Sequence, residues 1–323
     1  MTATPESSGP DAEGPTTTSP AAGPRRRRRH ARGAAAALIV LAMWMAASCL
    51  IAYRLTRRSR ARFDEPAPAA SWGPIEGLRL ATSDGHDIGG WFADGRDPAA
   101  PSVLLIHGNK GSRGNSLKRA GFLAAEGFAV MMISLRAHGD SSGDSNDFGL
   151  SARRDVVAAV ESLERRRPGR PIVVLGTSLG SAAASFASGE LGRRVSGYIL
   201  EAPFADLKTA VWNRTHTYLP PVLAPIAYAG LRAVGPLFVP ELDRISPLDA
   251  IRGVPSDVPV LIIAGEADTL ATPDEARAFL RAVDGHGELI LFPGAHHNNL
   301  YSSDPGRYER AVLDFCRRAG RAG

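Results

Sequence analysis

Cysteine is scarce in this chain, and the shortage excludes several classes of protein. The 323 residues contain two cysteines, Cys49 and Cys316. A disulfide-rich secreted scaffold needs four or more cysteines, and a structural zinc site needs ligands at close, regular spacing. Cys49 lies in an apolar run, so we do not expect the two thiols to pair with each other. We predict no metal and no cofactor. The two cysteines do not indicate whether the protein lies in an oxidising or a reducing compartment.

The folded part of the chain lacks a cluster of basic residues. The net charge is +5, but residues 1–62 hold 11 arginines and only three acidic residues. The remaining residues carry a net charge of −3. A nucleic-acid-binding face requires lysines and arginines gathered on a folded surface. We therefore predict no nucleic-acid partner.

Long, predominantly hydrophobic runs are also scarce, and the clearest one lies at residues 33–53. Residues 33–53 contain no charged residue and would span about 31 Å as a helix, which matches a bilayer core. Six arginines precede this run and five follow it. The tighter N-terminal cluster favours an inside N-terminus, which would place the folded domain outside the cytoplasm. We predict a single-pass membrane anchor, while a cleaved signal peptide or a lipoprotein signal at Cys49 stays open.

Composition divides the chain into four segments. Residues 1–32 are predicted to be a disordered basic tail, because their polar, Pro-rich and Gly-rich start cannot bury enough surface to fold. The anchor at 33–53 is followed by an arginine-rich and then Pro/Ala-rich linker at 54–74. Residues 75–323 are predicted to form one folded domain.

Short apolar runs alternate with helical patterns throughout that domain. The runs do not alternate in polarity, which is typical of strands covered on both faces. They lie at Val103–Ile106, Ala129–Ile133, Ile172–Leu175, Tyr198–Leu200, Val260–Ile263 and Leu289–Phe292. Leu78–Thr82 and Ile88–Phe92 flank a glycine turn and predict an antiparallel hairpin. We predict an α/β fold with a mostly parallel, doubly wound sheet after that hairpin.

One long segment interrupts the alternation. Residues 204–246 are rich in apolar and aromatic residues and are too long for a plain loop. We predict a helical lid over the sheet. Ordinary packing by additional core helices is the other interpretation, and both can hold.

Ser178 is the candidate nucleophile. It lies in Gly176-Thr177-Ser178-Leu179-Gly180, directly after an apolar strand and before a run of small residues. A strand, a sharp turn and a helix in this order raise a serine hydroxyl above the end of a sheet, with glycines where the bend is crowded. The motif alone arises readily by chance, so a catalytic role for Ser178 also requires an acid and a histidine elsewhere in the sequence.

Those partners are expected downstream, in the order acid and then histidine. Asp268 follows the strand at Val260–Ile263 and is preferred over Glu266, which is closer to the strand end. Two adjacent histidines, His296 and His297, follow the last predicted strand. Only one of them can face Ser178. We predict His297 as the base and keep His296 as the alternative.

An acyl-transfer site also needs two N–H groups for the developing oxyanion. The backbone of Leu179, next to Ser178, is one candidate donor. Asn109, in the turn Ile106-His107-Gly108-Asn109 after an early strand, is the other. The loop continues as Lys110-Gly111-Ser112-Arg113-Gly114, but the lysine precedes the glycines, so a phosphate-binding loop is excluded.

Together these segments resemble the α/β-hydrolase superfamily over residues 75–320. The resemblance rests on His107-Gly108-Asn109, Arg136–Ser141, Gly176–Gly180, Gly265–Asp268 and Gly294–Asn298. It is strongest to the branch similar to monoacylglycerol lipases and serine aminopeptidases, which includes single-pass membrane-anchored hydrolases. The family's ending Gly-x-Gly-His-Asn aligns its histidine with His297, although His296 here replaces a small residue.

The resemblance implies a serine hydrolase that cleaves a carboxylic ester, with a small-molecule acyl substrate of lipid-like character as one expectation. A serine at the turn argues against the epoxide and halide branches, which carry aspartate there. An acyltransferase or peptidase using the same three residues, and a non-catalytic binding or scaffold protein on the same fold, are the alternatives.

Overall fold

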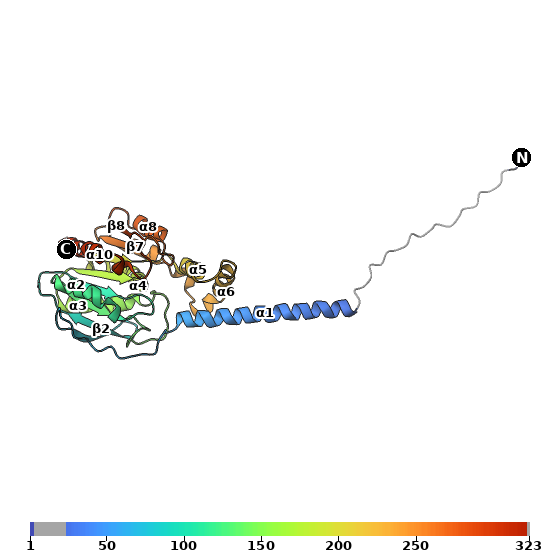
Figure 1. Cartoon of the computed structure of the whole chain (residues 1–323), viewed down its shortest axis with the longest axis horizontal. Coiled ribbons are helices and arrows are strands. Elements are labelled where there is room, and N and C mark those ends of the chain that lie inside the picture. The colour runs from blue at the N-terminus through green and yellow to red at the C-terminus, as the bar shows by residue number, and fades with distance from the viewer. Residues whose placement is uncertain (3–23, 322–323) are drawn as a thin grey trace. The chain divides into compact units, whose positions relative to one another are not determined.

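Eight strands form one sheet in the computed structural model, which describes residues 1–2 and 24–321 (Figure 1). Their order in the sheet is β1-β2-β4-β3-β5-β6-β7-β8. The strands are β1 Glu76–Ala81, β2 Asp87–Ala93, β3 Ser102–Ile106, β4 Ala129–Ile133, β5 Ile172–Thr177, β6 Gly197–Glu201, β7 Val260–Gly265 and β8 Gly287–Phe292. Strand β2 pairs antiparallel with both β1 and β4, and all other neighbours are parallel. The predicted fold class and its N-terminal hairpin are confirmed.

The central strands are apolar on both faces because helices cover both sides of the sheet. Every residue of β3 is buried, and in register Val103 lies opposite Val130 on β4 and Val173 on β5. One apolar layer joins the sheet to α3, α4 and α8, and the other joins it to α2 and α10. Cys316 on α10 is fully buried in the second layer. This arrangement explains why the strand runs show no polarity alternation.

Helices connect or follow the strands and cover the sheet. They are α2 Leu117–Ala125, α3 Arg153–Arg166, α4 Leu179–Leu191, α7 Pro247–Ala250, α8 Pro273–Ala282, α9 Leu300–Ser303 and α10 Pro305–Ala319. Helix α8 begins with a capping box, in which Thr272 and Glu275 satisfy each other's backbone N–H groups. Pro273 occupies its first turn, where a missing N–H costs no hydrogen bond.

Two helices occupy the segment at 204–246, which we call the lid. They are α5 Leu207–Tyr218 and α6 Leu223–Phe238. The predicted helical insertion is therefore present. Some of its apolar side chains are buried, such as Leu207 and Val234, but others are exposed: Tyr218 is 68% exposed, and Val222 and Leu237 are each 75% exposed.

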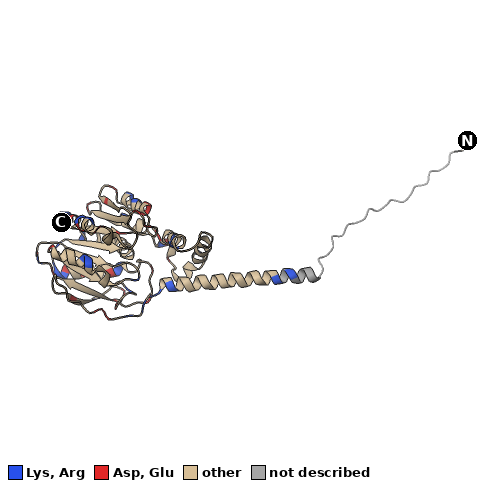
Figure 2. Cartoon of the chain, viewed as in Figure 1, with Lys and Arg blue, Asp and Glu red and all other residues tan. Residues whose placement is uncertain are grey.

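Helix α1, Pro24–Thr56, contains the uncharged run and extends beyond it at both ends. Its stretch Arg32–Thr56 is long and apolar enough to cross a bilayer, and Figure 2 shows α1 without charge between its basic ends. The helix starts inside the segment predicted as tail because arginine is a good helix former and Pro24 suits a helix start. Residues 3–23 of that predicted tail lie outside the described residues. The chain forms two compact units, Met1–Met45 and Ala46–Gly323.

The segment predicted as linker is tied to the sheet by polar contacts. The guanidinium of Arg58 donates to the carbonyls of Gly139 and Gly143. The carboxylate of Glu65 accepts from Ser134, and its carbonyl accepts from Trp91 and Arg113. Pro/Ala-rich composition gave no sign of these contacts, because their partners are distant in the sequence.

Candidate functional site

Ser178 lies at the sharp turn between β5 and α4. Its backbone has φ 50° and ψ −104°, a left-handed conformation that costs energy for any residue with a side chain. Its N–H is held by the carbonyl of Glu201 on the neighbouring strand β6, at 2.8 Å. The strained turn is thus fixed by the sheet beside it, and the serine is 6% exposed.

The two glycines of the turn allow the helix to approach the strands closely. A Cβ at Gly176 would lie 2.4 Å from the carbonyl carbon of Gly180. A Cβ at Gly180 would lie 2.5 Å from the carbonyl oxygen of Ile106 on β3. Both distances are too short for any side chain, so the motif's glycines are required by packing.

The structure brings Ser178, His297 and Asp268 into one hydrogen-bonded chain. His297 Nε2 is 3.0 Å from Ser178 Oγ, and His297 Nδ1 is 2.8 Å from Asp268 Oδ2. Because a carboxylate only accepts hydrogen bonds, Nδ1–H donates to Asp268 and Nε2 is left to accept from the serine hydroxyl. This tautomer is the one that can remove a proton from serine.

Asp268 is held firmly after β7. It is 2% exposed, and its Oδ1 accepts the backbone N–H groups of Leu270 and Ala271. The two candidates that the sequence left open lie elsewhere. Glu266 is exposed, and His296 is exposed with its Nδ1 at the carbonyl of Ala267.

Comparisons with known proteins agree with this architecture. A family model described as serine aminopeptidase, S33, matches residues 97–239. The chain is 29% identical over 258 residues to the Mycobacterium tuberculosis protein Rv2307c, covering 78% of this chain and 82% of the relative. The solved structure of Pyrococcus furiosus esterase Pf2001 matches with a TM-score of 0.62 at 22% identity, covering 80% and 98% of the two chains. These similarities and the fold support the α/β-hydrolase superfamily.

One protein to which this chain is similar has a substrate in its name. The lysophosphatidylserine lipase ABHD12 of Xenopus tropicalis is 24% identical over 182 residues, which cover 52% of this chain and 46% of the relative.

The turn after β3 places Asn109 beside Ser178, and two histidines fix its shape. His107 Nδ1 lies 2.7 Å from the carbonyl of Gly108, and its Nε2 accepts the N–H of Leu135. His138 Nε2 accepts the N–H of Lys110. Burial, with a contribution from His138, lowers the pKa of His107 to about 3, so its ring stays neutral and keeps both contacts.

The side-chain oxygen of Asn109 is held by two donors, and its backbone N–H is the candidate donor to an oxyanion. Asn109 Oδ1 accepts from Asn146 Nδ2 and from the N–H of Lys110. Leu179, the second predicted donor, begins α4, where N–H groups have no partner within the helix.

An apolar cavity of about 500 Å³ opens beside Ser178. Its walls come from the turn after β3, from the lid and from the last turns of α1. They include Gly108, Asn109, Val211, Arg214, Tyr218, Leu231, Ile51, Leu55 and His297. A second cavity of about 50 Å³, lined by Phe148, Phe204 and Leu207, also reaches Ser178. Both suit an apolar acyl group.

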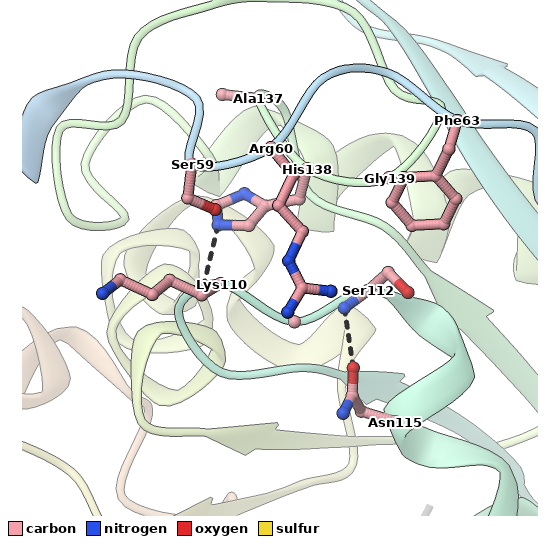
Figure 3. A pocket seen from close by; sticks show the side chains of 10 residues that line it. Ser59, Arg60, Phe63, Lys110, Ser112, Asn115, Ala137, His138 and Gly139 are labelled. Atoms are coloured by element: carbon pink, nitrogen blue, oxygen red, sulfur yellow. Dashed lines mark hydrogen bonds between the residues drawn. The ribbon is translucent and has the colours of Figure 1, made fainter. Parts of the chain in front are cut away.

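A smaller polar cavity of about 40 Å³ lies beside the linker (Figure 3). Figure 3 shows the backbone of Lys110 bonded to His138 and Ser112 bonded to Asn115 within its lining. Ser178 and His297 do not line it. The glycine-containing loop that follows Asn109 is therefore held by His138 and by its own Asn115.

The motif Arg136–Ser141 has a structural role. Arg136 pairs with Asp84 and Asp155, and Asp140 pairs with Arg113. Ser141 Oγ accepts the N–H of Gly89. These contacts join the hairpin to the parallel part of the sheet and add no group to the site.

Sequence reasoning missed a buried polar network beneath the nucleophile. Glu201, at the end of β6, pairs with Arg119 and accepts hydrogen bonds from Tyr308 and Thr177. Ser181 donates to its carbonyl. Because Thr177 directly precedes Ser178, this network holds the turn from below. Sequence reasoning also missed Arg214, and no local motif marks either feature.

Proposed function

We propose that this chain is a membrane-anchored serine hydrolase that cleaves carboxylic esters through an acyl-enzyme. Ser178 is the nucleophile, His297 the general acid and base, and Asp268 the group that orients the imidazole. The observation that carries the proposal is the hydrogen-bonded chain from Ser178 Oγ through His297 to Asp268, at 3.0 and 2.8 Å.

The reaction follows from these positions. His297 Nε2 takes the proton as Ser178 Oγ attacks the ester carbonyl, and the N–H groups of Asn109 and Leu179 stabilise the oxyanion. The imidazolium then protonates the departing alcohol, which leaves an acyl-serine. Water attacks this ester while His297 takes its proton, and collapse releases the acid and restores Ser178.

The cavity and the anchor support an ester of lipid character as substrate. The cavity beside Ser178 has mainly apolar walls, and Ile51 and Leu55 of α1 contribute to them. The relative ABHD12 is named for its action on a lysophospholipid. Residues 33–53 would anchor the chain, with the N-terminus inside and the domain outside the cytoplasm.

A Ser178→Ala variant tests the proposal most directly. We expect hydrolysis of p-nitrophenyl butyrate to fall by about 10⁴-fold or more, and labelling by a fluorophosphonate probe to disappear. Thr177→Ser, at the neighbouring position, is the matched control, since the hydroxyl that contacts Glu201 is kept. Wild-type turnover by Ser178→Ala would refute the proposal.

A further inference from the structure

Arg214 is a cation in an otherwise mainly apolar cavity. It lies on α5 and lines both cavities that reach Ser178. Its side chain is partly buried, and one of its N–H groups donates to the carbonyl of Ala210, one turn earlier on the same helix. A guanidinium has five N–H donors, so most of its capacity is unused by that contact.

No carboxylate within the described part of the chain forms an ion pair with Arg214. The other shielded arginines of this domain do have such partners: Arg113 pairs with Asp140, and Arg119 pairs with Glu201. Burial lowers the pKa of Arg214, although the group stays charged at neutral pH.

The two carboxylates whose charge acts on Arg214 accept hydrogen bonds from other donors. Asp268 accepts from His297 and two backbone N–H groups. Glu275 accepts from Ala205, Asn213 and Thr272. Both carboxylates act on Arg214 through their charge, but neither forms an ion pair with it in the described part of the chain, so the cation lining the cavity has no direct anionic partner.

A partly desolvated cation without a partner is costly, and a bound anion would remove that cost. We infer that Arg214 binds an anionic group of the substrate, a phosphate or a carboxylate, while the apolar walls hold its hydrocarbon part. The substrate class is thus an ester that carries a negative charge. This inference rests on the proposed function, because Arg214 matters only if Ser178 acts on what the cavity holds.

The lid also offers a matched control. Arg232 on α6 lines neither cavity and lies 3.7 Å from Asp243, with 38% of its side chain exposed. Replacing it removes one positive charge from the same insertion without changing the cavity walls.

Competitive inhibition of p-nitrophenyl butyrate hydrolysis by octyl phosphate, nonanoate and 1-octanol tests the inference. The first two probes distinguish phosphate from carboxylate, and the third has no charge. In the wild type we expect an anionic probe to bind more tightly than octanol. Arg214→Gln should reduce that preference by about 10-fold or more, Arg214→Lys should retain part of it, and Arg232→Gln should leave it unchanged.

Using the ratio of two inhibition constants within one variant makes the result independent of the amount of active protein. An unchanged ratio in Arg214→Gln, or an equal loss in Arg232→Gln, would overturn the inference while leaving the proposed function intact. Wild-type hydrolysis by Ser178→Ala would instead overturn the proposed function, and this inference with it.

Discussion

The sheet and the lid are both rich in apolar residues, but only the lid leaves several large apolar side chains exposed. On β3, Val103, Leu104 and Leu105 are fully buried, whereas Val222 and Leu237 of the lid are each 75% exposed. The three residues of the hydrogen-bonded chain all come from loops at the ends of sheet strands, while the lid contributes walls to the cavity. We infer that the sheet carries stability and reaction chemistry, and that the lid selects the substrate.

The largest expected effect concerns the two adjacent histidines that follow β8. His297→Ala should lower kcat/KM for p-nitrophenyl butyrate by about 10³-fold or more, because it removes the group that takes the serine proton. His296→Ala should stay within a few-fold, because that ring faces solvent and the carbonyl of Ala267. Initial rates of the two variants decide the matter, and the reverse order of effects would assign the base to His296.

A cavity mutation in each region tests the difference in stability. Phe279→Ala on α8 removes a fully buried ring and should cost about 3–5 kcal/mol of unfolding free energy. Val222→Ala in the lid should change it by less than about 0.5 kcal/mol. Urea unfolding of the full chain in a single detergent measures both. Similar losses in the two variants would mean that the lid surface is covered in solution.

An ion pair in each region sharpens the comparison. Arg119→Met leaves Glu201 buried and unpaired and should cost about 3–5 kcal/mol. Adding Glu201→Gln should recover part of the loss. In the lid, Lys208 pairs with Asp243 in solvent, and Lys208→Met should give no measurable change. A loss in the lid variant as large as that of Arg119→Met would contradict the assignment of stability to the sheet.

A pH dependence of stability should originate in the turn after β3, and its effect should be smallest near neutral pH. Burial lowers the pKa of His107 to about 3, so between that value and about pH 6.5 the unfolded chain binds a proton that the folded chain does not. His107 should therefore reduce stability as the pH falls through this range, by up to about 1.4 kcal/mol per unit. His107→Gln should make the unfolding free energy less dependent on pH there. Equal slopes for wild type and variant would show that the ring titrates in the folded state.

Much of the fold could be predicted because buried parallel strands appear in the sequence as short, continuous apolar runs. Continuous runs such as Ile172–Leu175 can be covered on both faces only in a sheet between helices. The turn at Ser178 could also be predicted, because it requires glycine at two positions. A Cβ at either position would lie too close to neighbouring backbone atoms.

The remaining features depend on partners that are distant in the sequence. Arg119 and Glu201 are 82 positions apart, and Arg119 and Tyr308 are 189 apart, so no local pattern joins them. The exposure of the lid was not predictable either, because helical periodicity shows which side chains share a face and not what covers that face. The role inferred for Arg214 could not be predicted from the sequence either, because it depends on the lack of an ion pair with any carboxylate in the described part of the folded chain.

The burial of Cys316 in α10 makes it possible to label α1 selectively through Cys49. Burial raises the pKa of its thiol to about 12, so almost no reactive thiolate forms at neutral pH. The chain has one other cysteine, Cys49 in α1, which is partly exposed. A maleimide dye added to the native protein should attach at Cys49 alone. Its emission in vesicles would then report whether that part of α1 sits in water or in lipid, without any engineered residue.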